Sequence, residues 1–274
     1  MSRTVSLESF LHRDRVIVGL ALAVVVVLSW TYIFLGGGTG TPALQMSGFP
    51  TAPHMSDPMA AMQPSQWTFG YAALIFVMWW LMMLATMLPS ASPMILLFAA
   101  LARRQNESRV PYLGTGFFGL GYLAVWAAFS ALAVALQWQL ARLALLSPMM
   151  VTTSVTLGAC LLIGAGIWQF TPLKHACLQH CRAPVDFLSR HWHAGRSGAL
   201  QMGVLHGAYC LGCCWMLMLL LFYGGIMNIF WIAGLATLVL VEKIAPMGTR
   251  ISGFIGAALI FWGGTVLVHL LRSQ

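Results

Sequence analysis

Residues 199–223 read ALQMGVLHGAYCLGCCWMLMLLLFY, a run that contains no charged residue. An α-helix needs about 20 predominantly apolar residues to cross the hydrocarbon core of a bilayer, so this run predicts a membrane-spanning helix. The whole chain of 274 residues has the same character, with 59% hydrophobic and 7% charged residues. Long apolar runs of this kind are typical of membrane proteins. The composition therefore predicts an all-α, polytopic membrane helix bundle that is surrounded by the lipid bilayer.

Apolar runs along the chain predict about seven transmembrane helices. The sixth run is short for a full span, and the second can continue through Pro89 and Pro93 towards Leu101 as a kinked helix. Three parts follow: a cytoplasmic segment with a first anchor (1–35), an outer loop rich in Gly, Pro and Met (36–66) and a six-helix membrane domain (67–274). The seven runs cover residues 16–35, 68–88, 112–137, 150–170, 199–223, 226–241 and 252–270.

Basic residues predict how this bundle is oriented. If the N-terminus is cytoplasmic, only Arg142 and Arg272 of the 14 Lys and Arg residues fall on the outer side. Cytoplasmic loops of membrane proteins carry an excess of Lys and Arg. We therefore expect a multi-pass membrane protein with its N-terminus in the cytoplasm and its C-terminus outside. The same topology accounts for the net charge of +8 without a nucleic-acid partner.

The run 199–223 also carries a cluster of three cysteines, Cys210, Cys213 and Cys214. Residues three and four apart share a helix face. Thiolate, thioether and imidazole groups are ligands that soft metal ions such as Cu(I) prefer. The alternative is simple packing, because free Cys and Met are common core residues. The face of the cluster adds three further candidate ligands, His206, Met202 and Met218.

The second span supplies methionines that can complete such a site. Met82 and Met83 follow Trp79 and Trp80 in this span, although core packing is an alternative for them too. Gly203 and Gly207 lie on the side of the cysteine cluster, and small residues at this spacing let another helix approach closely. We expect the second span to be that neighbour, with Met82 or Met83 close to Cys210 or Cys214.

The predicted cytoplasmic segment 171–198 contains a second pair of thiols, Cys177 and Cys181. They share a helix face with Lys174, and a nearby cation favours the thiolate form that binds metal. His175 and His180 flank them and could complete the closed tetrahedral set that zinc prefers. The alternative is an interfacial helix with two incidental thiols.

Two other segments contain candidate functional residues. The outer loop includes the run His54–Met62, whose His and Met residues could capture Cu(I) or could belong to a disordered linker. Glu242 and Lys243 follow the sixth span and are expected to neutralise each other at the membrane interface. Ionisable groups inside a membrane are candidates for function.

Four motifs together are similar to a bacterial family of predicted metal-binding integral membrane proteins, over about residues 70–265. The resemblance implies a multi-helix inner-membrane protein that binds metal, and it implies no reaction. The motifs are Trp79 through Pro89 with its double methionine, Lys174-x-x-Cys177-Leu178-x-x-Cys181-Arg182-x-Pro184, Gly207-x-Tyr209-Cys210-x-Gly212-Cys213-Cys214-Trp215-x-Leu217-Met218, and Glu242-Lys243.

Three classes of function remain open. We favour Cu(I) handling, by transport or by delivery to a membrane or periplasmic cuproprotein, and prefer copper to zinc because the donors are soft. The second class is a membrane thiol oxidoreductase, since Cys210 and Cys213 have the C-x-x-C spacing of redox pairs. The third is a structural or assembly subunit. Whether the protein is an enzyme stays open, with a non-enzymatic role favoured. The expected metal ligands are Cys210, Cys213, Cys214, His206, Met82, Met83, Met218, Cys177 and Cys181.

Overall fold

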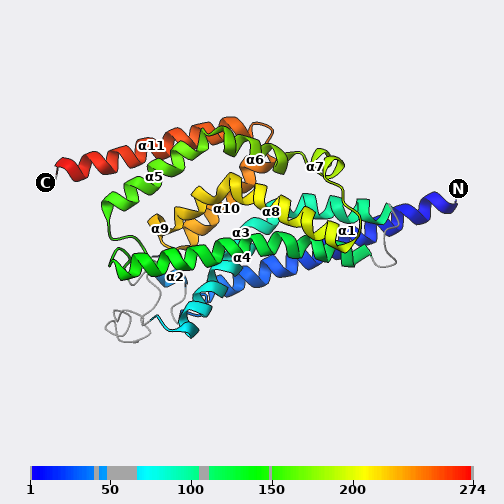
Figure 1. Cartoon of the computed structure of the whole chain (residues 1–274), viewed down its shortest axis with the longest axis horizontal. Coiled ribbons are helices and arrows are strands. Elements are labelled where there is room, and N and C mark those ends of the chain that lie inside the picture. The colour runs from blue at the N-terminus through cyan, green and yellow to red at the C-terminus, as the bar shows by residue number, and fades with distance from the viewer. Residues whose placement is uncertain (1, 40–42, 48–66, 105–110, 148–149, 273–274) are drawn as a thin grey trace.

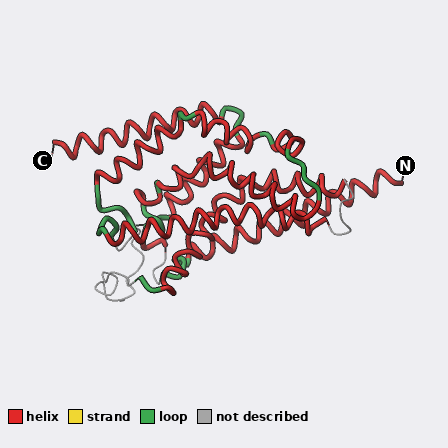
Figure 2. The backbone as a smooth tube through the Cα atoms, viewed as in Figure 1, coloured by secondary structure: helices red, strands yellow, loops and turns green. Residues whose placement is uncertain are grey.

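The computed structural model describes residues 2–39, 43–47, 67–104, 111–147 and 150–272. Within these ranges the chain forms helices and no strand (Figure 2), so the all-α prediction is confirmed. The Met-rich run at 54–62 lies outside the described residues. The helices are α1 (Ser2–Phe34), α2 (Ala43–Met46), α3 (Phe69–Arg104), α4 (Pro111–Arg142), α5 (Val155–Gln169), α6 (Pro172–Arg182), α7 (Pro184–Arg190), α8 (Gly195–Leu219), α9 (Leu221–Gly224), α10 (Ile229–Ile244) and α11 (Gly248–Arg272).

Among the described residues, five helical stretches are long and apolar enough to cross a membrane. A sixth is possible if α5 and α6, which meet at a bend of 64°, form one broken span. A helix lies at each of the seven predicted positions, but α5 and α10 have only 15 and 16 residues. The count of seven spans therefore stays a prediction. The five stretches are Val16–Phe34, Phe69–Arg103, Leu113–Arg142, Gly195–Gly224 and Gly248–Arg272.

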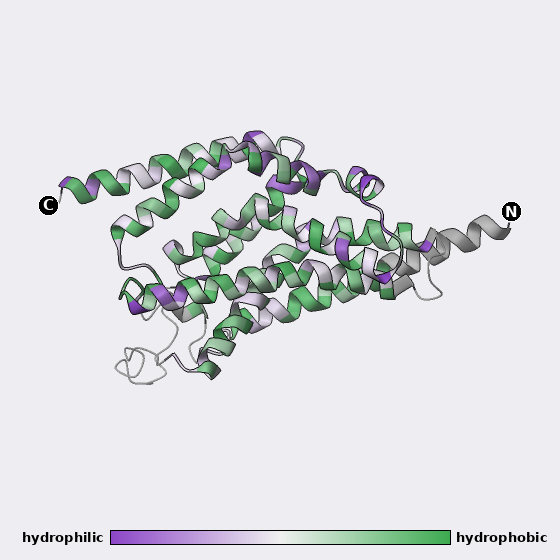
Figure 3. Cartoon of the chain, in the orientation of Figure 1, coloured by the Kyte–Doolittle hydropathy of each residue, from purple (hydrophilic) through white to green (hydrophobic). Residues whose placement is uncertain are grey.

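The long helices run back and forth along one axis of the molecule. Figure 1 shows α1, α4, α8 and α11 running towards the end of the molecule where the C-terminus lies, and α3, α5 and α10 running in the opposite direction. The two termini consequently lie at opposite ends of the long axis (Figure 1). Hydrophobic residues cover most of the long helices, whereas hydrophilic residues gather in α6 and α7 (Figure 3).

Helix α3 continues through two prolines, as the sequence predicted. A proline inside a helix removes one backbone N–H and leaves a carbonyl four residues earlier without its usual partner. The carbonyl affected by Pro93 belongs to Pro89, and it accepts a hydrogen bond of 2.8 Å from the Ser92 hydroxyl. The hydroxyl of Ser90 likewise donates to the carbonyl of Met87 at 2.9 Å. Such side-chain bonds let a proline-containing helix persist in an apolar environment.

The helix that packs closely on the glycines of α8 is α4. A Cβ atom added at Gly203 would collide with the backbone of Phe118, and one added at Gly207 would lie 3.3 Å from the Cα of Tyr122. Gly121 of α4 faces the backbone of α8 in the same way, because a Cβ atom added there would lie only 2.8 Å from the backbone nitrogen of Val204. The prediction that the second span is this neighbour is therefore wrong. Glycines on both helices explain the choice, because they let two backbones meet.

Candidate functional site

The three cysteines of α8 face the interior of the bundle, as predicted. Cys210 and Cys214 are 0% exposed and Cys213 is 1% exposed. The thiols of Cys213 and Cys214 donate to the backbone carbonyl of Cys210 at 3.1 and 2.9 Å. All three sulfurs are therefore held in the space between α8 and its neighbours.

Helix α3 brings a methionine to this cluster. The sulfur of Met87 lies 3.9 Å from the sulfur of Cys214. Met82 and Met83 are also fully buried, and Met87 follows Met83 by one helical turn. The methionine of α3 whose sulfur contacts Cys214 is thus one helical turn beyond the residues that we predicted. A ligand role for Met82 and Met83 stays a prediction.

Helix α10 brings a lysine to the same cluster. The ammonium group of Lys243 donates to the sulfur of Cys210 at 2.9 Å and to the hydroxyl of Ser90 at 3.0 Å. Only 7% of Lys243 is exposed. A buried cation at hydrogen-bond distance favours the thiolate form of a cysteine, which is the form that binds metals.

The neighbouring Glu242 points elsewhere, so the predicted mutual neutralisation of Glu242 and Lys243 is wrong. One carboxylate oxygen of Glu242 accepts from Lys174 of α6 at 2.8 Å. Lys174 also donates to the side chain of Gln169, which in turn accepts from Ser252 at 2.9 Å. Consecutive helical residues project about 100° apart, which explains why each member of the pair meets a different helix.

A tyrosine of α4 closes another side of the cluster. The hydroxyl of Tyr122 lies 3.2 Å from the sulfur of Cys210 and 3.3 Å from the carbonyl oxygen of Met87. Tyr122 is fully buried, and it lies beside the close α4–α8 contact at Gly207. Four helices, α3, α4, α8 and α10, therefore contribute side chains to one buried site.

Helix α6 covers the cluster with its two cysteines. The sulfur of Cys177 would lie 2.7 Å from a Cβ atom added at Gly212, so this glycine makes room for it. The thiol of Cys181 lies close enough to that of Cys213 for the two to interact electrostatically, and Cys181 packs against the buried core. Thr171 and Pro172 begin the helix, with the Thr171 hydroxyl accepting from the Lys174 N–H. The structure thus joins the two cysteine motifs that the sequence placed separately.

The predicted ligand His206 lies among aromatic rings. Its imidazole is 5.5 to 6.1 Å, centre to centre, from the rings of Phe118, Tyr122 and Phe187. Its Nδ1 atom is buried and has no hydrogen-bond partner among the described residues. Met218 is buried as well. The structure places both on α8, and their ligand role stays a prediction.

One pair of sulfur atoms, those of Cys214 and Met87, lies close enough together to contact the same metal ion. Within the described ranges, no group of three or more His, Cys, Asp or Glu side chains is arranged to hold one ion. Paired sulfurs from different helices are present instead, as in Cys214 and Met87. A zinc–thiolate bond is about 2.3 Å long, so two sulfurs on an ion of similar size lie up to about 4.6 Å apart. Their separation of 3.9 Å falls within this limit.

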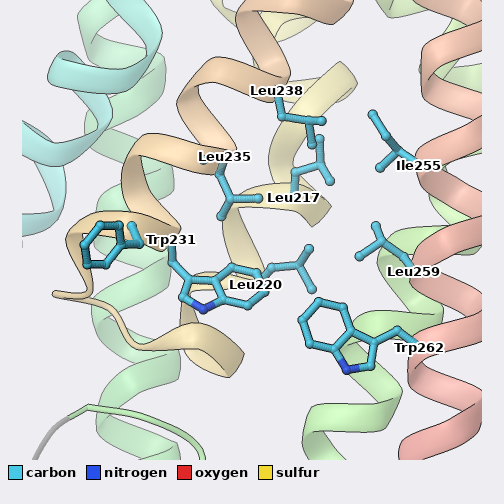
Figure 4. A pocket seen from close by; sticks show the side chains of 10 residues that line it. Leu217, Leu220, Trp231, Leu235, Leu238, Ile255, Leu259 and Trp262 are labelled. Atoms are coloured by element: carbon cyan, nitrogen blue, oxygen red, sulfur yellow. The ribbon is translucent and has the colours of Figure 1, made fainter. Parts of the chain in front are cut away.

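An apolar pocket of about 360 Å³ lies between α8, α10 and α11 (Figure 4). Leucine and isoleucine side chains and the indoles of Trp231 and Trp262 point into it, and none of them is a soft ligand. This pocket therefore offers no soft metal ligand.

Four residues that contact the cluster were missing from the expected ligand set: Met87, Tyr122, Ser90 and Lys243. Met87 had a signal in the sequence, because it lies four residues after Met83 and so shares its helix face. Lys243 belonged to a recognised motif, but its contact with Cys210 depends on a residue 33 positions away. Tyr122 and Ser90 carried no local signal of this kind.

Comparison with known proteins assigns the chain to a family. A family model described as the copper chaperone PpoB2 matches residues 76–266. The matched segment contains the sulfur cluster and both cysteine motifs. Searches for a similar curated protein and for a similar solved structure gave no significant match. Since the family model covers more than half of the chain, the protein belongs to the PpoB2 copper chaperone family.

Proposed function

We propose that this protein is a multi-pass chaperone of the bacterial inner membrane that carries Cu(I) on its buried sulfur cluster and delivers it to a membrane or periplasmic cuproprotein. Family membership supports copper as the cargo. The single observation that carries the proposal is the meeting of Cys214 and Met87, whose sulfurs lie 3.9 Å apart on different helices. Thiolate and thioether donors select Cu(I) among the biological metal ions.

The surroundings of the cluster support a monovalent copper ion. Cu(I) bound by two thiolates carries one net negative charge, and the ammonium group of Lys243 at Cys210 can balance it. Balancing matters because an isolated charge is costly in an apolar environment. Zinc is a poorer fit, since structural zinc sites use four protein ligands in a closed tetrahedron.

The proposed topology has seven spans, with the N-terminus and the segment 171–198 in the cytoplasm. The positive-inside rule supports this orientation. Helices that run alternately up and down the long axis, with the termini at opposite ends, support an odd number of crossings (Figure 1). Residues 16–34 of α1 and the whole of α11 expose large apolar side chains such as Leu28, Phe254 and Phe261, which suits contact with lipid.

Copper stoichiometry of purified protein tests the function. Wild-type protein, prepared anaerobically and loaded with Cu(I), is expected to retain copper under reducing conditions. Cys214→Ser and Met87→Leu should each weaken binding about tenfold or more, a loss of about 1.4 kcal/mol. Met94→Leu is the matched control, because Met94 is also buried in α3 and should bind copper like the wild type.

One result would replace this proposal with a redox function. If the wild type retains no copper, and mass spectrometry finds a reversible disulfide between Cys210 and Cys213, the protein is a thiol oxidoreductase. The C-x-x-C spacing of this pair is compatible with that chemistry.

A further inference from the structure

Cys181 differs from the other cysteines around the cluster in its exposure. It is partly exposed at the surface of α6, whereas Cys177 is 9% exposed and the three cysteines of α8 are buried. Cys160, the remaining cysteine of the chain, lies exposed on α5. Cys181 therefore combines access from the surface with a position beside the cluster.

The same residue touches the buried cluster. Its side chain packs against the buried core, and its thiol interacts electrostatically with that of Cys213, which is almost completely buried. Sulfur ligands on two packed helices can hold one soft ion together during an exchange when each lies about 2.3 Å from it. Cys181 is thus one ligand exchange away from the interior.

Several contacts fix α6 in this position. Arg182 donates to the carbonyl oxygens of Ala245 at 2.6 Å and Pro246 at 3.0 Å, beyond the end of α10. The buried pair of Lys174 with Glu242 holds the beginning of the helix. These contacts at both ends of α6 make the approach of Cys181 to Cys213 a feature of the fold.

We propose that Cys181 is the entry residue through which Cu(I) passes from a cytoplasmic thiolate donor to the buried cluster. The proposal rests on the copper function proposed above. In the first step copper forms a bond to the Cys181 sulfur and loses its bond to the donor thiolate. In the second it forms a bond to Cys213 and loses its bond to Cys181. Copper stays monovalent throughout, and at each step the proton of the incoming thiol goes to the thiolate that is released.

The charge and position of α6 favour a donor on the cytoplasmic side. The segment 171–198 is the one that the positive-inside rule places there, and reduced thiols are the usual state in that compartment. On its other sides the cluster is covered by Tyr122, Lys243 and Met87, all buried. An aqueous thiolate therefore meets Cys181 before it meets any sulfur of α8.

Copper release tests this route, because ligand exchange follows the same path in both directions. Full-length protein in nanodiscs, where both faces are accessible, is loaded with Cu(I) and mixed with the water-soluble chelator bathocuproine disulfonate. Cys181→Ser should still bind copper, and each protein is loaded to saturation first so that release is compared per copper ion bound. The serine variant should release copper at least about tenfold more slowly, because the exchange step through the Cys181 sulfur is lost. A tenfold slower release corresponds to an activation barrier that is higher by about 1.4 kcal/mol.

Two further variants sharpen the result. Cys160→Ser, an exposed thiol on another helix, should release copper at the wild-type rate. Cys181→Met should recover much of the rate, because a thioether binds Cu(I) but cannot form a disulfide. Elution of each variant as a single monodisperse species shows that it is folded.

Specific outcomes would overturn the proposal. Release from Cys181→Ser at the wild-type rate would exclude Cys181 from the route. Loss of equilibrium copper from this variant would make Cys181 part of the storage site instead of its entry. Release from Cys181→Met as slow as from the serine variant would contradict a ligand role. Wild-type protein that binds no copper would refute the chaperone function itself. The other three outcomes concern only the Cys181 variants, so the two kinds of failure can be distinguished.

Discussion

Gly203→Ala tests whether the α4–α8 contact holds the sulfur cluster together. The added methyl carbon would lie 2.8 Å from the carbonyl carbon of Phe118 and 3.0 Å from its Cα, and both are backbone atoms. A backbone cannot rotate away as a side chain can, so the two helices must separate. Overpacking of this kind costs about 1–3 kcal/mol, and alanine regains about 1 kcal/mol of helix propensity.

The net expectation for Gly203→Ala is a loss of stability of up to about 2 kcal/mol, because the overpacking cost equals or exceeds the propensity gain. In a domain of 150–250 residues each kcal/mol lowers the melting temperature by about 2–4 °C. Tryptophan fluorescence during thermal unfolding in detergent measures the shift. Gly116→Ala is the matched control on α4, because nothing lies within 4 Å of its Cβ position; its stability should stay the same or rise by up to about 1 kcal/mol.

The ranking of these two variants decides the matter. If Gly203→Ala unfolds at the same temperature as Gly116→Ala, or at a higher one, the close α4–α8 contact does not contribute as inferred. Copper binding gives a second measurement. In the wild type the Tyr122 hydroxyl lies 3.2 Å from the Cys210 sulfur, and separation of α4 from α8 would increase this distance. Gly203→Ala should therefore also bind Cu(I) more weakly than the control.

Two other predictions concern the lysine and the topology. Lys243→Met should weaken Cu(I) binding at least about tenfold, or about 1.4 kcal/mol, because it removes the cation 2.9 Å from the Cys210 sulfur. By Coulomb's law, two unit charges at this distance attract each other by about 6 kcal/mol at an effective dielectric constant of about 20. Lys243→Arg should keep more affinity than Lys243→Met, and equal titration curves for the two would contradict a role of the charge. In a cysteine-free background, an impermeant thiol reagent added to intact cells should label Leu143→Cys, an exposed position after the end of α4, but not Ser189→Cys. The reverse pattern would invert the proposed orientation.

Local sequence was sufficient for the helices and for placing the three cysteines of α8 on one face. An apolar run longer than about 20 residues has few alternatives to a helix when it lies in lipid, so the positions of α3, α4, α8 and α11 followed from composition. The spacing of Cys210, Cys213 and Cys214 placed them on one face because the helical repeat fixes the angle between them. The family match to copper chaperones agrees with the metal class that these donors predicted.

Only the tertiary structure decided which helices meet and which side chains share the site. The sequence pointed to the second span as the neighbour of Gly203, but Gly121 made α4 a better fit, and a close approach requires small residues on both helices. Met87 reaches Cys214 and Lys243 reaches Cys210 across large sequence separations. Such contacts depend on how whole helices are rotated and shifted against one another, which packing sets and no local pattern encodes. The sequence therefore determined which helices form and which soft donors each of them carries, and the packing of α3, α4, α6 and α10 around α8 determined which of these side chains meet.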